Sequence, residues 1–144
     1  MNFSLEIGPK TELDTLPALK DVYITMLPGG DYKDTSEQAS KLVKKGLNPI
    51  PHFPARSIEN DVQLKEYVSR CKDVGVKQVL VIGGSREPIG SFDSSIQILE
   101  TGYFEKMKIG IAGHPEGSPD ISDSKLEKAM KDKKPYADYI VTQW

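Results

Sequence analysis

Polar and glycine residues follow short apolar segments at six places along this chain. They are Glu6, Thr25, His52, the turn 83–85, the loop 113–120 and the pair Thr142-Gln143. Carboxyl, hydroxyl, imidazole and amide groups can bind a small polar molecule, and the first three can exchange protons with it. The sequence therefore predicts a small-molecule site made from the ends of several successive segments.

Glu6 is suited to proton donation and His52 to hydrogen bonding with a ligand. Glu6 alternates with Phe3 and Leu5, so we expect it to be partly desolvated, which would prepare a carboxyl group to donate a proton near neutral pH. A solvated carboxylate at a strand end is the alternative. His52 stands between Pro51 and Phe53, a stiff context in which a neutral imidazole could donate to a phosphate or carbonyl. Packing alone would also explain it.

The remaining candidates are suited to binding. Gly83-Gly84-Ser85 allows a ligand to approach the backbone closely, although a plain turn between a strand and a helix gives the same pattern. The loop 113–120 holds two glycines, two prolines and two acids, a composition typical of binding loops, and His114 and Glu116 lie in it. Thr25 and Gln143 could equally satisfy backbone groups. With two histidines and no partner at ligand spacing, we expect no zinc or iron site.

These residues must be positioned by six short apolar strands that alternate with amphipathic helices. The predicted strands are Phe3–Ile7, Val22–Met26, Asn48–Phe53, Gln78–Ile82, Lys108–Ala112 and Tyr139–Gln143. The predicted helices are Ser36–Lys45 with Thr35 as its cap, Glu59–Val74, Ser94–Glu105, Asp123–Lys133 and a shorter one within Glu12–Leu19. Such alternation is typical of an α/β protein with a parallel sheet.

Two architectures fit this order of elements, an open doubly wound sheet and a closed barrel. Every strand ends in a polar or glycine-rich group, which favours a parallel (β/α) barrel of the TIM type over a sheet with one switch point. A barrel needs eight strands, and about six βα units are visible. We therefore expect an incomplete barrel occupying residues 1–144 as one domain, with self-association or a second chain completing it.

Composition narrows the class of protein. The 144 residues carry a formal net charge of −2 and a pI of about 5.7, without a basic stripe, so nucleic acid is not an expected partner. Cys71 is the one cysteine, which favours a reducing compartment. No leader-like start and no long apolar run occur, so we expect a cytoplasmic protein without a membrane partner.

The ordered strand-end motifs resemble the methylenetetrahydrofolate reductase family, whose members are flavin-dependent (β/α)8 barrels. The resemblance covers the whole chain. It rests on Phe3-Ser4-Leu5-Glu6, Val22-Tyr23-Ile24-Thr25, Pro51-His52-Phe53-Pro54-Ala55-Arg56, Val81-Ile82-Gly83-Gly84, Phe92-Asp93-Ser94-Ser95 with Leu99-Glu100-Thr101-Gly102, His114-Pro115-Glu116-Gly117 and Ile140-Val141-Thr142-Gln143.

The resemblance implies the FAD-dependent reduction of 5,10-methylenetetrahydrofolate to 5-methyltetrahydrofolate in one-carbon metabolism. Glu6 would be the catalytic acid and Gln143 would bind the folate substrate. Non-covalent FAD would contact a larger set of residues. NADH or NADPH would be the possible electron donor. This implied cofactor set is Thr25, His52, Gly84, Ser85, His114, Glu116 and Lys131.

Three positions depart from the family pattern. Ser85 stands where many relatives carry an aspartate, so the carboxylate that would stabilise a cationic folate intermediate is replaced by a neutral hydroxyl. His114 and Ser118 stand where some relatives carry tyrosine and histidine. Two alternatives therefore remain open: an accessory protein that binds folate or flavin without turnover, and folate-linked methyl transfer on the same scaffold.

Overall fold

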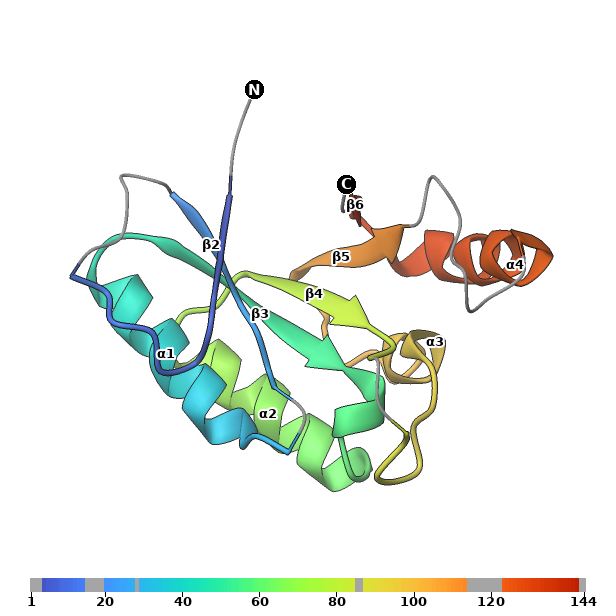
Figure 1. Ribbon diagram of the computed structural model, residues 1–144, viewed down its shortest axis with the longest axis horizontal. Helices are drawn as coiled ribbons and strands as arrows, with labels where there is room; N and C mark the ends of the chain where they lie inside the picture. The colour runs from blue at the N-terminus through green and yellow to red at the C-terminus, as the bar shows by residue number, and fades with distance from the viewer. Residues whose placement is uncertain (1–3, 15–19, 28, 85–86, 114–122, 143–144) are drawn as a thin grey trace.

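Six parallel strands form one sheet in the computed structural model, which describes residues 4–14, 20–27, 29–84, 87–113 and 123–142. The strands follow one another in the order of the chain (Figure 1). They are β1 (Leu5–Ile7), β2 (Asp21–Ile24), β3 (Asn48–Pro54), β4 (Gln78–Ile82), β5 (Lys108–Gly113) and β6 (Tyr139–Thr142). The sheet curls into a half-barrel, which confirms the predicted α/β class and the incomplete (β/α) barrel.

The helices lie between the strands, as the alternation predicts. They are α1 (Tyr32–Lys44), α2 (Asp61–Asp73), α3 (Ser95–Leu99) and α4 (Asp123–Lys133), with short 3-10 turns η1 (Ala55–Ser57) and η2 (Lys134–Tyr136). Figure 1 shows α1 and α2 side by side on one face of the sheet, and α3 and α4 toward the β5 end. The interval 15–19, which holds most of the helix expected within Glu12–Leu19, lies outside the described residues.

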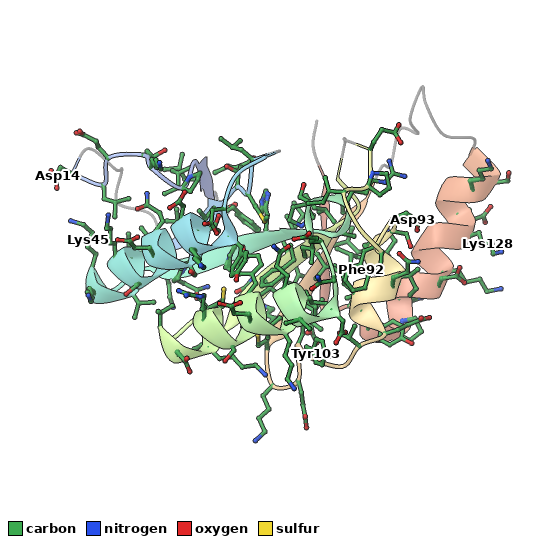
Figure 2. All side chains as sticks on the ribbon, turned by 90° about the horizontal axis from the view of Figure 1, so that it is seen from below. Asp14, Lys45, Phe92, Asp93, Tyr103 and Lys128 are labelled. Carbon is green, nitrogen blue, oxygen red and sulfur yellow. The ribbon has the colours of Figure 1, made fainter. Side chains whose placement is uncertain are left out.

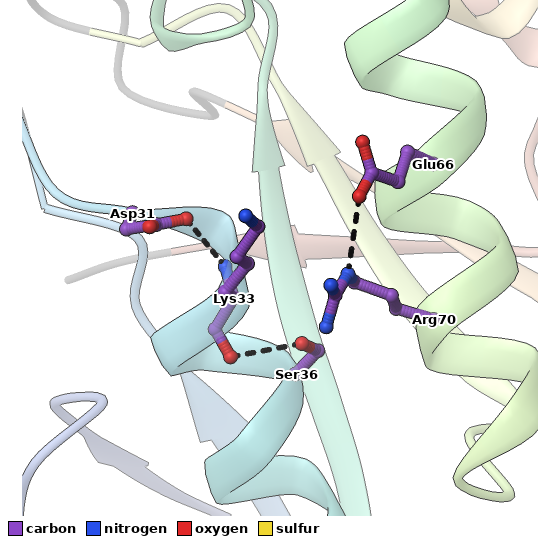
Figure 3. A network of polar contacts seen from close by, with 5 residues as sticks. All are labelled: Asp31, Lys33, Ser36, Glu66 and Arg70. Atoms are coloured by element: carbon purple, nitrogen blue, oxygen red, sulfur yellow. Dashed lines mark hydrogen bonds and ion pairs between the residues drawn. The ribbon is translucent and has the colours of Figure 1, made fainter.

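Two predicted helix boundaries are wrong for identifiable reasons. Helix α1 begins one turn before Ser36, because the Asp31 carboxylate accepts a hydrogen bond from the Lys33 amide at 2.9 Å and caps the helix (Figure 3). Thr35 is buried and donates to the Thr25 carbonyl instead, so it ties the helix to the end of β2. Helix α3 ends at Leu99 rather than near residue 105. It cannot continue that far because Gly102 takes a φ of 74°, which is outside the helical range.

The hydrophobic core lies between the sheet and its helices. Alternate strand residues such as Ile24, Phe53 and Val79 are fully buried and pack against α1 and α2. Cys71 belongs to the same core, where burial raises the pKa of its thiol to about 12 and keeps it in the unreactive protonated form. This face gives the sheet the support that fixes the positions of the strand ends.

The opposite, inner face of the sheet carries a second layer of packed side chains. Ile50 is 0% exposed and Leu80 is 5% exposed, although neither belongs to the core cluster beneath the helices. Tyr139 of β6 lies over Gly110 of β5, where a methyl group would overlap the tyrosine ring, and its hydroxyl donates to the Val79 carbonyl of β4 at 3.3 Å. A side chain that reaches across two strands shows how strongly the sheet curls.

No helix in the described part of the chain is long and apolar enough to cross a bilayer.

Candidate functional site at the strand ends

Glu6 and His52 lie near one another at the carboxyl end of the sheet. Glu6 pairs with Tyr23 in the β1–β2 register, and the Tyr23 ring meets the His52 ring edge to face at a centroid distance of 6.1 Å. The negative charge of Glu6 acts directly on the His52 imidazole. The structure therefore places the candidate proton donor Glu6 near His52, one of the candidate cofactor-binding residues.

Glu6 does not have the partly desolvated environment expected from its sequence context. Its side chain is exposed on the inner face of the sheet. Strand β1 forms one edge of the described sheet, so it has a neighbouring strand on one side only. A carboxylate in this position is open to water and to a ligand alike, and a bound ligand would itself supply the desolvation.

His52 is held more rigidly than Glu6. Burial lowers the pKa of its imidazole below the ordinary value of 6.5, and the nearby Glu6 carboxylate opposes that shift without overcoming it. Its main-chain carbonyl accepts a hydrogen bond from the buried Tyr67 hydroxyl at 2.8 Å. The imidazole is therefore neutral at pH 7, with one nitrogen able to donate and the other able to accept.

A measurable pH dependence of stability follows from this lowered pKa. As pH falls below about 6.5, the unfolded chain binds a proton at His52 before the folded protein does, so acid destabilises the native state. We expect His52→Gln to remove up to about 1.4 kcal/mol per pH unit from the slope of unfolding free energy in that window. Urea unfolding at pH 5.0 to 8.0 measures it. Equal slopes for both proteins would contradict the expected environment of His52.

Thr25 has a structural role in the described structure. Its amide donates to the Ile7 carbonyl at 2.9 Å, and its hydroxyl donates to the same oxygen at 3.3 Å. The hydroxyl proton is therefore used, and only the oxygen lone pairs remain for a ligand. Thr25 can accept a hydrogen bond from a bound molecule while it holds β2 against β1.

Gly84 takes a φ of +96°, a conformation that favours glycine at this turn. The turn packs against the end of β3, because the Arg56 amide donates to the Gly83 carbonyl at 3.0 Å. The next described residues continue this contact, with the Ile89 amide donating to the Arg56 carbonyl and the Ser91 amide to the Glu59 carbonyl, each at 3.1 Å. The glycine pair is thus part of a turn fixed to η1, with Gly84 exposed beside the end of β3.

Lys131 was a candidate for reaching the cofactor from the helix that follows β5. It is exposed in the last turn of α4, which leads back toward the start of β6 and hence toward the amino end of the sheet. A lysine there would have to reach along the helix to meet a ligand at the carboxyl ends, and its cofactor contact stays a prediction. Four further candidates lie outside the described residues. They are Ser85, His114, Glu116 and Gln143.

A polar layer on the inner face of the sheet was not predicted from the sequence. Asn48 donates to Asp21 and to Gln78, each at 3.1 Å, and the side chains of Gln78 and Tyr23 lie close to Tyr139, where they affect its pKa. The signal was available, because these residues occupy every second position of their strands on the side opposite the core. The layer fills the interior beneath the candidate site and supports Tyr23.

Other features of the described residues do not form a second candidate. A cavity of about 220 Å³ lies between the segment after β1 and helix α1, lined by Lys10, Thr11, Asp34, Gln38 and Lys41 among others. It is away from His52 and holds charges of both signs. Within the described ranges, no three histidine, cysteine or acidic side chains are grouped as a metal site requires.

The fold and the strand ends define an α/β protein built as a parallel (β/α) half-barrel. No protein-family model matches the chain. Among solved structures, the X-ray crystal structure of the YdjI aldolase from Escherichia coli K12 aligns with 88% of this chain, at 14% sequence identity and a TM-score of 0.49. The chain spans 44% of the length of that aldolase chain. A likeness at this level says nothing about activity.

Proposed function

We propose that this chain belongs to a flavin-dependent oxidoreductase that reduces 5,10-methylenetetrahydrofolate to 5-methyltetrahydrofolate, with NADH or NADPH as electron donor. The observation that carries the proposal is that Glu6 of β1 and His52 of β3 lie near one another on either side of β2, in the order of motifs that resembles the methylenetetrahydrofolate reductases. Ligands of parallel barrels bind at this end of the strands. A second copy of the chain, or another chain, would complete the barrel around the ligands.

The hydrogen-bonding groups near the strand ends fit a flavin nucleotide. Neutral His52 offers one donor and one acceptor, and Thr25 offers acceptor lone pairs. Gly84 has no side chain to keep a flat ring from the backbone. A flavin ring edge carries both carbonyl acceptors and an N–H donor, so this mixed set matches it. Bound FAD would supply the hydride chemistry.

The residues of the chain would then provide position and a proton. Glu6, exposed beside the neutral His52, would give a proton to the folate as its five-membered ring opens, and it would be desolvated by the substrate that covers it. His52 would hold the cofactor through a hydrogen bond, with its backbone fixed by Tyr67. Gln143 and the loop residues His114 and Glu116 remain part of the proposal from the family resemblance.

We expect the purified protein to bind FAD, to show a flavin absorption spectrum and to melt at a higher temperature with FAD than without it. A ligand at 100 times its Kd stabilises the folded state by about 2.7 kcal/mol. Glu6→Gln should bind FAD equally well and lose about 100-fold or more in folate reduction, since it cannot donate the proton. Absorbance, thermal melting and an NADH-dependent folate assay measure these quantities.

Glu105→Gln is the matched control for the glutamate variant. Glu105 is likewise exposed but follows α3, away from His52, so its replacement should change neither FAD binding nor turnover. A colourless protein whose melting temperature responds to neither FAD nor 5-methyltetrahydrofolate would rule out the proposed function.

Ser85 favours a second candidate, an accessory protein that binds folate or flavin without turnover. A serine hydroxyl cannot stabilise a developing cation as a carboxylate does. Binding without turnover in both the native protein and Ser85→Asp would support this role. A gain of FAD-linked turnover in Ser85→Asp would support the oxidoreductase. Folate-linked methyl transfer without flavin remains a third reading, without an observation that favours it.

A further inference from the structure

Tyr23 occupies the space between the two residues of the proposed site. Its backbone pairs with Glu6 on one side, and its ring meets the His52 ring on the other, with an interplanar angle of 65°. Tyr23 is not among the site residues predicted from the sequence. Because its ring touches the imidazole rather than a reacting atom, its contribution would be to position His52.

The hydroxyl of Tyr23 lies close to that of Tyr139 of β6, so each side chain affects the pKa of the other. The Tyr139 ring lies over Gly110, and its hydroxyl donates to the Val79 carbonyl at 3.3 Å. Strands β2 and β6 are separated by three other strands in the sheet. The two tyrosines therefore lie near one another inside the half-barrel, and the packed Tyr139 ring limits the space in which the Tyr23 ring can move.

We propose that Tyr23 is a positioning residue that holds the His52 imidazole in one orientation and shields it from water. The proposal deepens the proposed function, because an oriented neutral imidazole is what a flavin would meet. Three other groups face His52: the Glu6 carboxylate from β1, the Tyr67 hydroxyl from α2 on its carbonyl, and the Leu80 side chain beside it in the β3–β4 register. Among the described residues, Tyr23 supplies the aromatic ring that meets the His52 imidazole.

The test compares the titration of His52 in the native protein, Tyr23→Leu and Tyr23→Phe, followed through the imidazole proton by NMR. Tyr23→Leu removes the ring, so the His52 pKa should rise toward 6.5 as water reaches the imidazole. Tyr23→Phe keeps the ring and should leave the titration unchanged. FAD affinity should fall about tenfold in Tyr23→Leu, through the lost orientation of His52. The second histidine signal is assigned with His52→Gln.

Tyr136→Leu is the control, because Tyr136 is an exposed tyrosine of η2, and it should leave the His52 titration unchanged. An unaltered His52 titration in Tyr23→Leu would overturn the proposal, as would a phenylalanine variant that behaves like the leucine one. The native protein gives an independent check if the leucine variant does not fold, since the ring contact requires a nuclear Overhauser effect between Tyr23 and His52. Its absence would also overturn the proposal.

These measurements separate the two proposals. The His52 titration needs no ligand, so a protein that binds no FAD but shows the Tyr23-dependent titration would refute the proposed function and retain the positioning role. A protein that binds FAD but whose His52 titration is the same with and without the Tyr23 ring would retain the proposed function and refute the positioning role.

Discussion

Replacing Phe53 by alanine is expected to lower the free energy of unfolding by about 3–5 kcal/mol, a large part of the stability of a domain this size. Phe53 is 0% exposed. Its ring stacks on Tyr67 at a centroid distance of 3.9 Å and meets Phe104 edge to face at 5.0 Å. Truncation would remove both aromatic contacts and leave a cavity that three packed elements cannot close. Urea unfolding followed by circular dichroism measures the change.

Phe53→Leu is the matched control for the cavity. Leucine keeps most of the buried apolar volume, so the loss should be clearly smaller than that of alanine. The alanine variant should also disturb the candidate site, because Tyr67 both stacks on Phe53 and holds the His52 carbonyl. Equal stability of the alanine and leucine variants would mean that Phe53 is not packed as the structure has it.

The strands of this protein could be predicted closely because they are short apolar runs bounded by turn residues. The apolar run from Val79 to Ile82 is too short for a buried helix and fits a buried strand. Strand β4 begins and ends where the sequence indicated. Helix α4 likewise matches its predicted range. Local patterns of this kind report burial and period, which fix the type of each element and its place in the order of the sheet.

Side-chain contacts between strands are harder to predict because they depend on curvature. The sequence places Tyr23 and Tyr139 on separate strands with no sign that they meet. Their contact arises only because the sheet curls and because Gly110 leaves room for the Tyr139 ring. The sequence left both a desolvated and a solvated Glu6 open for a related reason, since period 2 gives the face of a residue but not whether its strand lies at the edge of the sheet.

The fixed turn after β4 provides the second large expected effect. We expect Gly90→Ala to lower the free energy of unfolding by about 2–3 kcal/mol. A methyl group at this position would overlap the Glu59 main-chain carbonyl, which is backbone and cannot rotate away. Either the strain stays in the folded state, or the segment moves off η1 and draws the buried Phe92, which Figure 2 shows beside Asp93, out of the core. Both responses cost stability.

Gly83→Ala separates this overlap from the general effect of replacing a glycine. Gly83 lies in the same turn, its φ is negative, and an added methyl group would meet nothing within 4 Å. The free energy of unfolding of this variant should therefore lie within about 0.5 kcal/mol of that of the native protein. The melting temperature of Gly90→Ala should be about 10 °C below that of the native protein. Because the same segment carries Gly84 to the end of β3, loosening it should weaken ligand binding beside His52 as well. Identical melting temperatures for the two variants would show that the segment does not rest on Glu59.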